Sequence, residues 1–263
     1  MPYRVDISAP PPDAIDRLVQ LGALDIEPVG DGLAAIVPDA VTPGAVAAAL
    51  GVDRVAVSAA VARDSGSVWL LGPRAVQIGG LLIVPPGIAA PPGALRLNDS
   101  AAFGTGHHPT TALCVEALEE ILSVECPDSV LDVGTGTGIL ALAALQLGVP
   151  RAVGLDIDPE ALKAASRNAR WNGLADRLSL VLGGPEAVQG QWPLVVANVL
   201  AAPLIEMAPL LVRRLQRHGR LILSGIPSTL ESEVRHAYRH LGMQHIASQS
   251  RAGWVMLVCQ SPW

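Results

Sequence analysis

Residues 130–138 restrict the fold more than any other part of the chain, because an apolar run is followed there by three glycines at alternate positions. The segment reads Val-Leu-Asp-Val-Gly-Thr-Gly-Thr-Gly. Glycines let a backbone turn sharply and approach a ligand closely. The free amides at the start of a following helix favour a polar or anionic group. We therefore predict a strand at 130–133, a ligand-binding turn and a helix at 138–147.

Segments with strand-like and helix-like patterns alternate from about residue 99 onward. The expected strands are 152–155, 178–182, 194–197 and 220–223, the expected helices are 159–172, 203–216 and 229–241, and a closing hairpin is expected at 245–249 and 254–258. This alternation is typical of a doubly wound, mostly parallel sheet with helices on both faces. The predicted fold class of this part is therefore α/β and Rossmann-like.

The first 61 residues have a shorter rhythm, with strands expected at 3–8, 24–29, 33–37 and 52–61 and helices at 13–21 and 42–50. The first helix carries four apolar residues that we expect on one side, Ile15, Leu18, Val19 and Leu21. The order β-α-β-β-α-β indicates a ferredoxin-like α+β domain. Glycine and proline recur through 62–98, which we interpret as a linker with a strand at 77–84. The larger domain is then 99–263.

Two acidic residues flank the glycine turn. Asp156 stands 22 positions after Gly134 at the end of the next predicted strand, where a carboxylate accepts the hydroxyls of a ribose. The glycines do not have the Gly-x-Gly-x-x-Gly spacing of a dinucleotide site. Asp132 would repel a pyrophosphate but attract an amine or a sulfonium. A dehydrogenase is therefore disfavoured, and a purely structural glycine-rich turn is the other alternative.

Residues 131–136 resemble the first motif of class I S-adenosylmethionine-dependent methyltransferases. More specific are residues 102–111 (Ala-Phe-Gly-Thr-Gly-His-His-Pro-Thr-Thr) and 197–204 (Ala-Asn-Val-Leu-Ala-Ala-Pro-Leu). Together with the N-terminal unit, they resemble the PrmA family, the lysine methyltransferases of ribosomal protein L11. The resemblance covers nearly the whole chain. It implies a small substrate-recognition domain, a linker and a domain that binds S-adenosylmethionine.

The same resemblance implies roles for individual residues. Thr111 would contact S-adenosylmethionine from a covering helix, Gly134 would lie against its amino-acid part, and Asp156 would hold the ribose. Asn198 would lie at the mouth beside the reacting methyl group, as the catalytic candidate and a cofactor contact. The other cofactor-binding candidates are Phe103, Asp132 and Gly136. The sequence identifies no general base for the acceptor lysine.

Two departures from the family pattern concern the acceptor. Asn98-Asp99-Ser100 stands where family members carry Asp-Pro-Gly, and only Trp69 remains of a tryptophan-rich acidic stretch. The alternative is therefore a methyltransferase of the same fold that acts on a different protein or a small molecule. A third hypothesis, a nucleoside-binding protein without turnover, is disfavoured by Asn198 and the segment 103–111.

The composition of the chain limits the kinds of molecule that we expect it to bind. The net charge is −6, which disfavours direct nucleic-acid binding and suits a small basic ribosomal protein as substrate. Three scattered cysteines, Cys114, Cys126 and Cys259, argue against a disulfide framework or a structural zinc site. Adjacent side chains such as His107 and His108 usually diverge, so we expect no metal. Without a signal peptide or an apolar stretch of ~18 residues, we expect a cytoplasmic protein that does not contact membranes, and a monomer.

Overall fold

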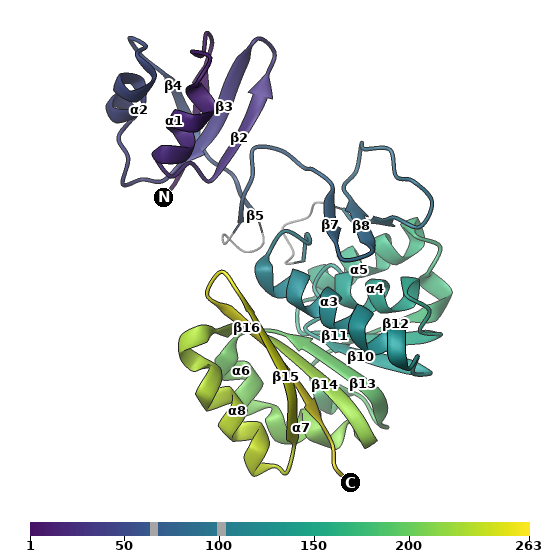
Figure 1. Ribbon diagram of the computed structural model, residues 1–263. Helices are drawn as coiled ribbons and strands as arrows, with labels where there is room; N and C mark the ends of the chain where they lie inside the picture. Colours follow the sequence, from purple (N-terminus) through teal and green to yellow (C-terminus); the bar gives the residue numbers. More distant parts are fainter. Residues whose placement is uncertain (64–67, 99–103) are drawn as a thin grey trace. The chain divides into compact units, whose positions relative to one another are not determined.

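A computed structural model describes residues 1–63, 68–98 and 104–263 of the chain. Contacts within it divide the chain into two compact units, residues 1–73 and residues 74–263. Figure 1 shows the elements of both units, and each unit is described below by itself. No helix among the described residues is long and apolar enough to cross a membrane.

The first unit is a small α+β structure with a four-stranded antiparallel sheet in the order β2-β3-β1-β4. Its elements are β1 (Tyr3–Ile7), α1 (Ala14–Gln20), β2 (Asp25–Val29), β3 (Gly32–Val37), α2 (Pro43–Leu50), β4 (Ala56–Ala59), β5 (Ala62–Arg63) and β6 (Val68–Trp69). Helix α2 has clear end signals: the Thr42 hydroxyl accepts the Ala45 N–H at 3.2 Å, and Gly51 ends the helix in the left-handed conformation.

The second unit is built on a seven-stranded sheet in the order β12-β11-β10-β13-β14-β16-β15. Its strands are β10 (Ser129–Val133), β11 (Arg151–Asp156), β12 (Leu178–Leu182), β13 (Trp192–Asn198), β14 (Leu215–Pro227), β15 (Gln244–Arg251) and β16 (Trp254–Gln260). Neighbours from β12 to β14 pair in parallel, whereas β16 is antiparallel to both β14 and β15. The predicted doubly wound, mostly parallel sheet is confirmed.

Helices cover both faces of this sheet (Figure 1). They are α3 (Pro109–Val124), α4 (Ile139–Gln146), α5 (Pro159–Trp171), α6 (Ala201–Glu206), α7 (Ala208–Arg213) and α8 (Glu231–His240), with short 3₁₀ turns at Ala175–Arg177, Pro185–Ala187 and Ser228–Leu230. Strand residues alternate between the two faces. Val130 and Val196 join the core under α3 and α4, whereas Leu131 and Val195 join the core under α6, α7 and α8.

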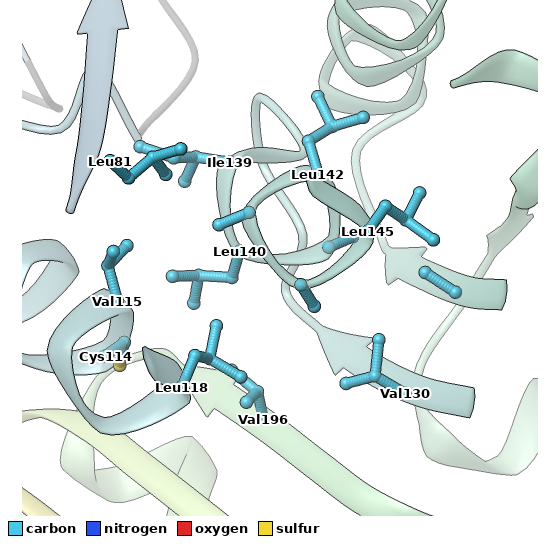
Figure 2. Close-up of a cluster of buried hydrophobic side chains, with 14 of the residues drawn as sticks. Leu81, Cys114, Val115, Leu118, Val130, Ile139, Leu140, Leu142, Leu145 and Val196 are labelled. Carbon is cyan, nitrogen blue, oxygen red and sulfur yellow. The ribbon is translucent and has the colours of Figure 1, made fainter. Parts of the chain in front are cut away.

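The core under α3 and α4 fixes the helices that frame the glycine turn. Figure 2 shows side chains of this cluster, among them Leu118 of α3, Leu140 of α4 and Val196 of β13. Helix α4 is buried all round, from Ile139 to Leu145. A helix that is apolar on every side belongs in the interior, so the residues that precede α4 are held firmly against the sheet.

Residues 62–98 differ from the expected linker with one strand. They contain a three-stranded sheet of β7 (Val76–Ile78), β8 (Leu81–Val84) and β9 (Leu95–Arg96). The side chains of Ile78, Ile83 and Leu95 are buried in the same core as α3 and α4. The boundary between compact units therefore falls after Pro73 rather than at residue 61 or 98. Glycines and prolines between residues 79 and 93 lie in and beside the turns that connect these short strands.

Two other expectations are corrected. The helix predicted at 203–216 is two short helices, α6 and α7, and residues 215 and 216 already belong to β14. Pro209 lies in the first turn of α7, where it lacks an N–H and restricts the residue before it, so the helix is interrupted at Met207. The strand predicted at 52–61 is limited to β4, Ala56–Ala59.

Candidate functional site

The candidate site lies at the carboxyl ends of β10, β11 and β13. Strand β10 is at the centre, with Val133 in register with Leu155 of β11 and with Ala197 of β13. The chain leaves β10 through α4 toward β11 on one side, while β13 adds on the other side. Ligands of open α/β sheets bind at such a switch point, outside the carboxyl ends of the strands.

The glycine turn between β10 and α4 is held tightly against β11. The N–H groups of Gly134 and Thr135 both donate to the Leu155 carbonyl, at 2.9 and 2.8 Å. Gly134 has a φ of +74°, and a Cβ there would lie 2.3 Å from Cγ1 of Val199. Conformation and space therefore both require glycine at position 134.

Asp156 connects the glycine turn to the end of β11. One carboxylate oxygen accepts the Gly136 N–H at 2.8 Å, and the other accepts the Asp158 N–H at 3.0 Å. The residue is half-buried. A carboxylate has about four acceptor positions, so each oxygen keeps a lone pair for a further donor. Asp156 therefore keeps acceptor capacity for the hydroxyl groups of a ligand.

Asp132 is a buried carboxylate with one oxygen bonded and one not. Its Oδ2 accepts the Thr135 hydroxyl at 2.7 Å and the Ala141 N–H at 3.1 Å. Its Oδ1 has no hydrogen-bond partner among the described residues. Burial raises the pKa of Asp132 to about 6; the bonds from Thr135 and Ala141 oppose the increase, and the charge of Asp156 adds to it. A positively charged ligand group beside Oδ1 would relieve this cost.

Asn198 and Thr111 carry the other two unpartnered polar atoms. Asn198 ends β13, and its Oδ1 is buried without a hydrogen-bond partner in the described structure. Thr111, in the first turn of α3, has a buried hydroxyl with no partner among the described residues. One helical turn later, burial raises the pKa of the Cys114 thiol, a hydrogen bond with Ser224 opposes the increase, and the Asp132 carboxylate adds to it. This start of α3 therefore lies near Asp132 and near Ser224, which pairs with Asn198.

These three atoms are the complete set of buried side-chain nitrogen and oxygen atoms without a partner among the side chains that the structure describes, those of residues 1–62, 68–98 and 104–263. All three belong to residues predicted to contact one ligand. Most buried polar groups in proteins are hydrogen-bonded, and each exception calls for an explanation. Their position at one end of the sheet leaves them available to a polar ligand.

Three further residues singled out in the sequence are Phe103, His107 and His108. Phe103 lies outside the described residues. His108 caps α3, with its Nδ1 accepting the Thr110 N–H at 3.3 Å, and His107 Nε2 lies 3.2 Å from the Arg74 carbonyl. Within the described part of the chain, no cluster of His, Cys, Asp and Glu could hold a metal ion.

Sequence reasoning missed Thr137 and Asn168. The Asn168 side chain donates a hydrogen bond to the Thr137 carbonyl of the glycine turn. Asn168 is fully buried and lies on a face of α5 made mostly of alanines, including Ala164 and Ala165. A polar residue on a buried helix face is usually hydrogen-bonded. The pattern of α5 therefore already indicated a buried hydrogen bond at Asn168. The partner of Asn168 was not readable, because residue 137 belongs to a turn.

Comparisons with known proteins agree with this geometry. The sequence model of the family described as ribosomal protein L11 methyltransferase (PrmA) matches residues 64–262. A protein named ribosomal protein L11 methyltransferase from Pelobacter propionicus is 37% identical over 217 residues, which cover 80% of this chain and 70% of that protein. Its namesake from Chromohalobacter salexigens is 48% identical over 186 residues, covering 69% of this chain and 61% of that protein.

Two solved structures are also similar to this chain. A ribosomal protein L11 methylase from Lactobacillus delbrueckii subsp. bulgaricus is 31% identical with a TM-score of 0.66, over 72% of this chain and 99% of that one. An S-adenosylmethionine-dependent O-methyltransferase from Thermotoga maritima, at 14% identity, has a TM-score of 0.51 over 56% of this chain and 64% of that one, and shows the fold alone.

Proposed function

Because the chain belongs to the ribosomal protein L11 methyltransferase (PrmA) family, we propose that it transfers methyl groups from S-adenosylmethionine to lysine side chains, and to the N-terminal amine, of ribosomal protein L11. The observation that carries the proposal is the set of three buried, unpartnered acceptors or hydroxyls on Thr111, Asp132 and Asn198. They lie at the end of the sheet where the fold binds its ligand.

The residues of the site fit S-adenosylmethionine by their chemistry. This donor carries an ammonium, a ribose and a methyl group activated by a sulfonium charge. Asp132 Oδ1 suits the ammonium, since an ion pair would relieve the cost of a buried carboxylate. Asp156 keeps lone pairs for ribose hydroxyls while it holds the Gly136 amide. The fit therefore assigns a different part of the donor to each carboxylate.

Asn198 is the residue that we assign to the acceptor amine. Its unpartnered Oδ1 can accept a hydrogen from a neutral amine and direct the nitrogen lone pair toward the methyl group. The amine needs to be deprotonated and aligned, since the methyl group is already activated. Positioning of this kind can supply much of the rate of a two-reactant step. Phe103 and Gly136 complete the proposed contacts of the donor.

The first unit, residues 1–73, is the proposed recognition domain. Its element order and its strand order, β2-β3-β1-β4, support classification as ferredoxin-like. It has nine acidic and four basic residues, a net charge of −5, and so holds most of the total charge of −6. An acidic surface attracts a basic partner and speeds its encounter. A small basic ribosomal protein has the charge that this unit would attract.

Mass spectrometry tests the activity directly. Ribosomal protein L11 from the same source, made without modification, is incubated with the protein and S-adenosylmethionine, and donor binding is measured in the same sample. Added mass in steps of one methyl group, mapped to lysines or to the N-terminal amine, is the expected result. Donor binding without added mass on L11 would contradict the substrate assignment and favour a different acceptor. The absence of donor binding would contradict the methyltransferase assignment itself.

A further inference from the structure

Asn168 of α5 joins the glycine turn to a distant part of the chain. Its Nδ2 donates to the Thr137 carbonyl at 2.8 Å, and its Oδ1 accepts the Asn98 N–H at 2.9 Å. Both ends of the amide are therefore used, and the side chain is fully buried. Helix α5 can come this close because Gly138 has no side chain. A Cβ at that position would lie only 3.0 Å from Cβ of Ala165.

Thr137 extends the connection on the other side of the turn. Its hydroxyl donates to the Gly104 carbonyl at 2.7 Å and is fully buried. A Cβ on Gly104 would lie 2.6 Å from this hydroxyl oxygen, so a glycine at position 104 leaves room for the Thr137 side chain. Gly104 begins the described stretch that leads to α3 and to Thr111, one of the three residues with an unpartnered buried atom.

We infer that Asn168 and Thr137 are positioning residues for the methyl donor, which act through the backbone groups that they bond. Asn168 fixes the backbone of the turn at Thr137, and the Thr137 hydroxyl fixes the approach to α3. The two connections set the spacing between Gly136, on the turn, and Thr111, on α3. The inference rests on the proposed function only in that S-adenosylmethionine is the ligand of this site.

The structure offers a matched control on the same helix. Asn172 is one turn after Asn168 and also bridges to the neighbouring backbone: it exchanges hydrogen bonds of 2.7 and 2.8 Å with Arg96 and donates to the Asn168 carbonyl at 2.7 Å. None of these hydrogen bonds reaches the glycine turn. Substitution of Asn172 therefore loosens the same segment of chain without freeing the turn.

The test measures donor affinity by calorimetry with S-adenosylmethionine and with S-adenosylhomocysteine, on the full chain. Asn168→Ala is expected to lose about tenfold in affinity for both, the effect of roughly one net hydrogen bond at a buried site. Asn172→Ala is expected to retain the affinity of the unsubstituted protein. Hydrogen exchange at the amides of residues 134–138 is expected to accelerate in Asn168→Ala and not in Asn172→Ala.

Thr137 gives an independent test if Asn168→Ala folds poorly. Thr137→Val keeps the shape of the side chain and removes the donor to Gly104, and about a tenfold loss of affinity is expected. Thr137→Ser keeps the hydroxyl and is expected to restore binding to within about twofold. Melting temperatures of all variants separate loss of stability from loss of affinity. In turnover, the KM for the donor should rise in the affected variants while the KM for L11 stays constant.

Two results would overturn the inference while leaving the proposed function intact. One is unchanged donor affinity in Asn168→Ala together with a lower melting temperature, as a purely structural amide predicts. The other is equal affinity of Thr137→Val and Thr137→Ser. If the unsubstituted protein bound neither S-adenosylmethionine nor S-adenosylhomocysteine, the proposed function would fail first, and the positioning role would fail with it.

Discussion

The substitution Asp132→Asn tests two effects of the buried carboxylate: how much its charge destabilises the free protein, and how much it contributes to donor binding. The amide oxygen of Asn can still accept from Thr135 and Ala141, the two donors to Asp132 Oδ2. The change therefore preserves the local shape, removes the negative charge and places an NH₂ group where Oδ1 has no partner among the described residues. We expect the affinity for S-adenosylmethionine to fall by about 10- to 150-fold, since a hydrogen bond to a charged group contributes ~1.5–3 kcal/mol.

The same substitution should change how stability depends on pH. Burial raises the pKa of Asp132 to about 6, whereas an Asp in an unfolded chain has a pKa of about 3.9. Between these values the folded protein holds a proton that the unfolded chain has released. The contribution of Asp132 to stability is therefore most favourable below about pH 4 and is lost as the pH rises through about 6, by ~3 kcal/mol in total. A ligand ammonium beside the carboxylate would restore part of this loss.

Urea unfolding without ligand, from pH 4 to pH 8, measures the effect. The free energy of unfolding of the unsubstituted protein, minus that of Asp132→Asn, should fall by ~3 kcal/mol over this range. The cost of the buried NH₂ group does not vary with pH, so the difference isolates the carboxyl. Calorimetry near pH 6 should also show proton release on donor binding in the unsubstituted protein only. A difference that is constant with pH, or an unchanged donor affinity, would refute the reasoning.

Four further outcomes are expected. Asp156→Ala should weaken donor binding by about 1.5–3 kcal/mol in calorimetry, because the ribose and the Gly136 amide both lose an acceptor; unchanged affinity would remove Asp156 from the site. Asn198→Ala should lower kcat about 100-fold with little change in donor affinity, and an equal kcat would contradict its role. Gly134→Ala should destabilise the protein by about 1–3 kcal/mol in urea, and adding Val199→Ala should recover only part. Residues 74–263 alone should bind the donor but fail to methylate L11, as followed by mass spectrometry.

The βα alternation of the second unit was readable from the sequence because its central strands, β10 and β13 above all, are buried on both faces and read as apolar runs. The short helix α1 was harder. Its apolar residues form two stripes, and the structure buries the one that contains Ala14 and Leu18. Ile15 and Val19, on the other stripe, are 50% and 61% exposed. A helix of seven residues has too few turns for its pattern to say which stripe will meet the sheet.

In residues 74–98 a strand was predicted at 77–84, but the three-stranded packed sheet was missed, for a different reason. The glycines and prolines of this segment were typical of a linker, and its strands are only two to four residues long. What makes them a sheet is the tertiary contact of Ile78, Ile83 and Leu95 with the core under α3 and α4. Local propensity carries no information about such distant contacts. For this reason a fragment that begins at residue 98 would expose the core, whereas one that begins at residue 74 keeps it covered.

The site shows the same limit at the level of single atoms. The family resemblance implied roles for Thr111 and Asn198, and the charge of Asp132 indicated a cationic ligand group. Whether a buried oxygen has a partner, however, depends on how the surrounding helices pack. The alanines of α5 let that helix approach Gly138, and this approach brings Asn168 within reach of the turn. The amide satisfies a backbone carbonyl that would otherwise be buried alone. The side chains of Asn168 and Thr137 are thus paired within the protein. Thr111, Asp132 and Asn198 each keep one buried atom without a partner among the described residues, and these atoms are available to the ligand.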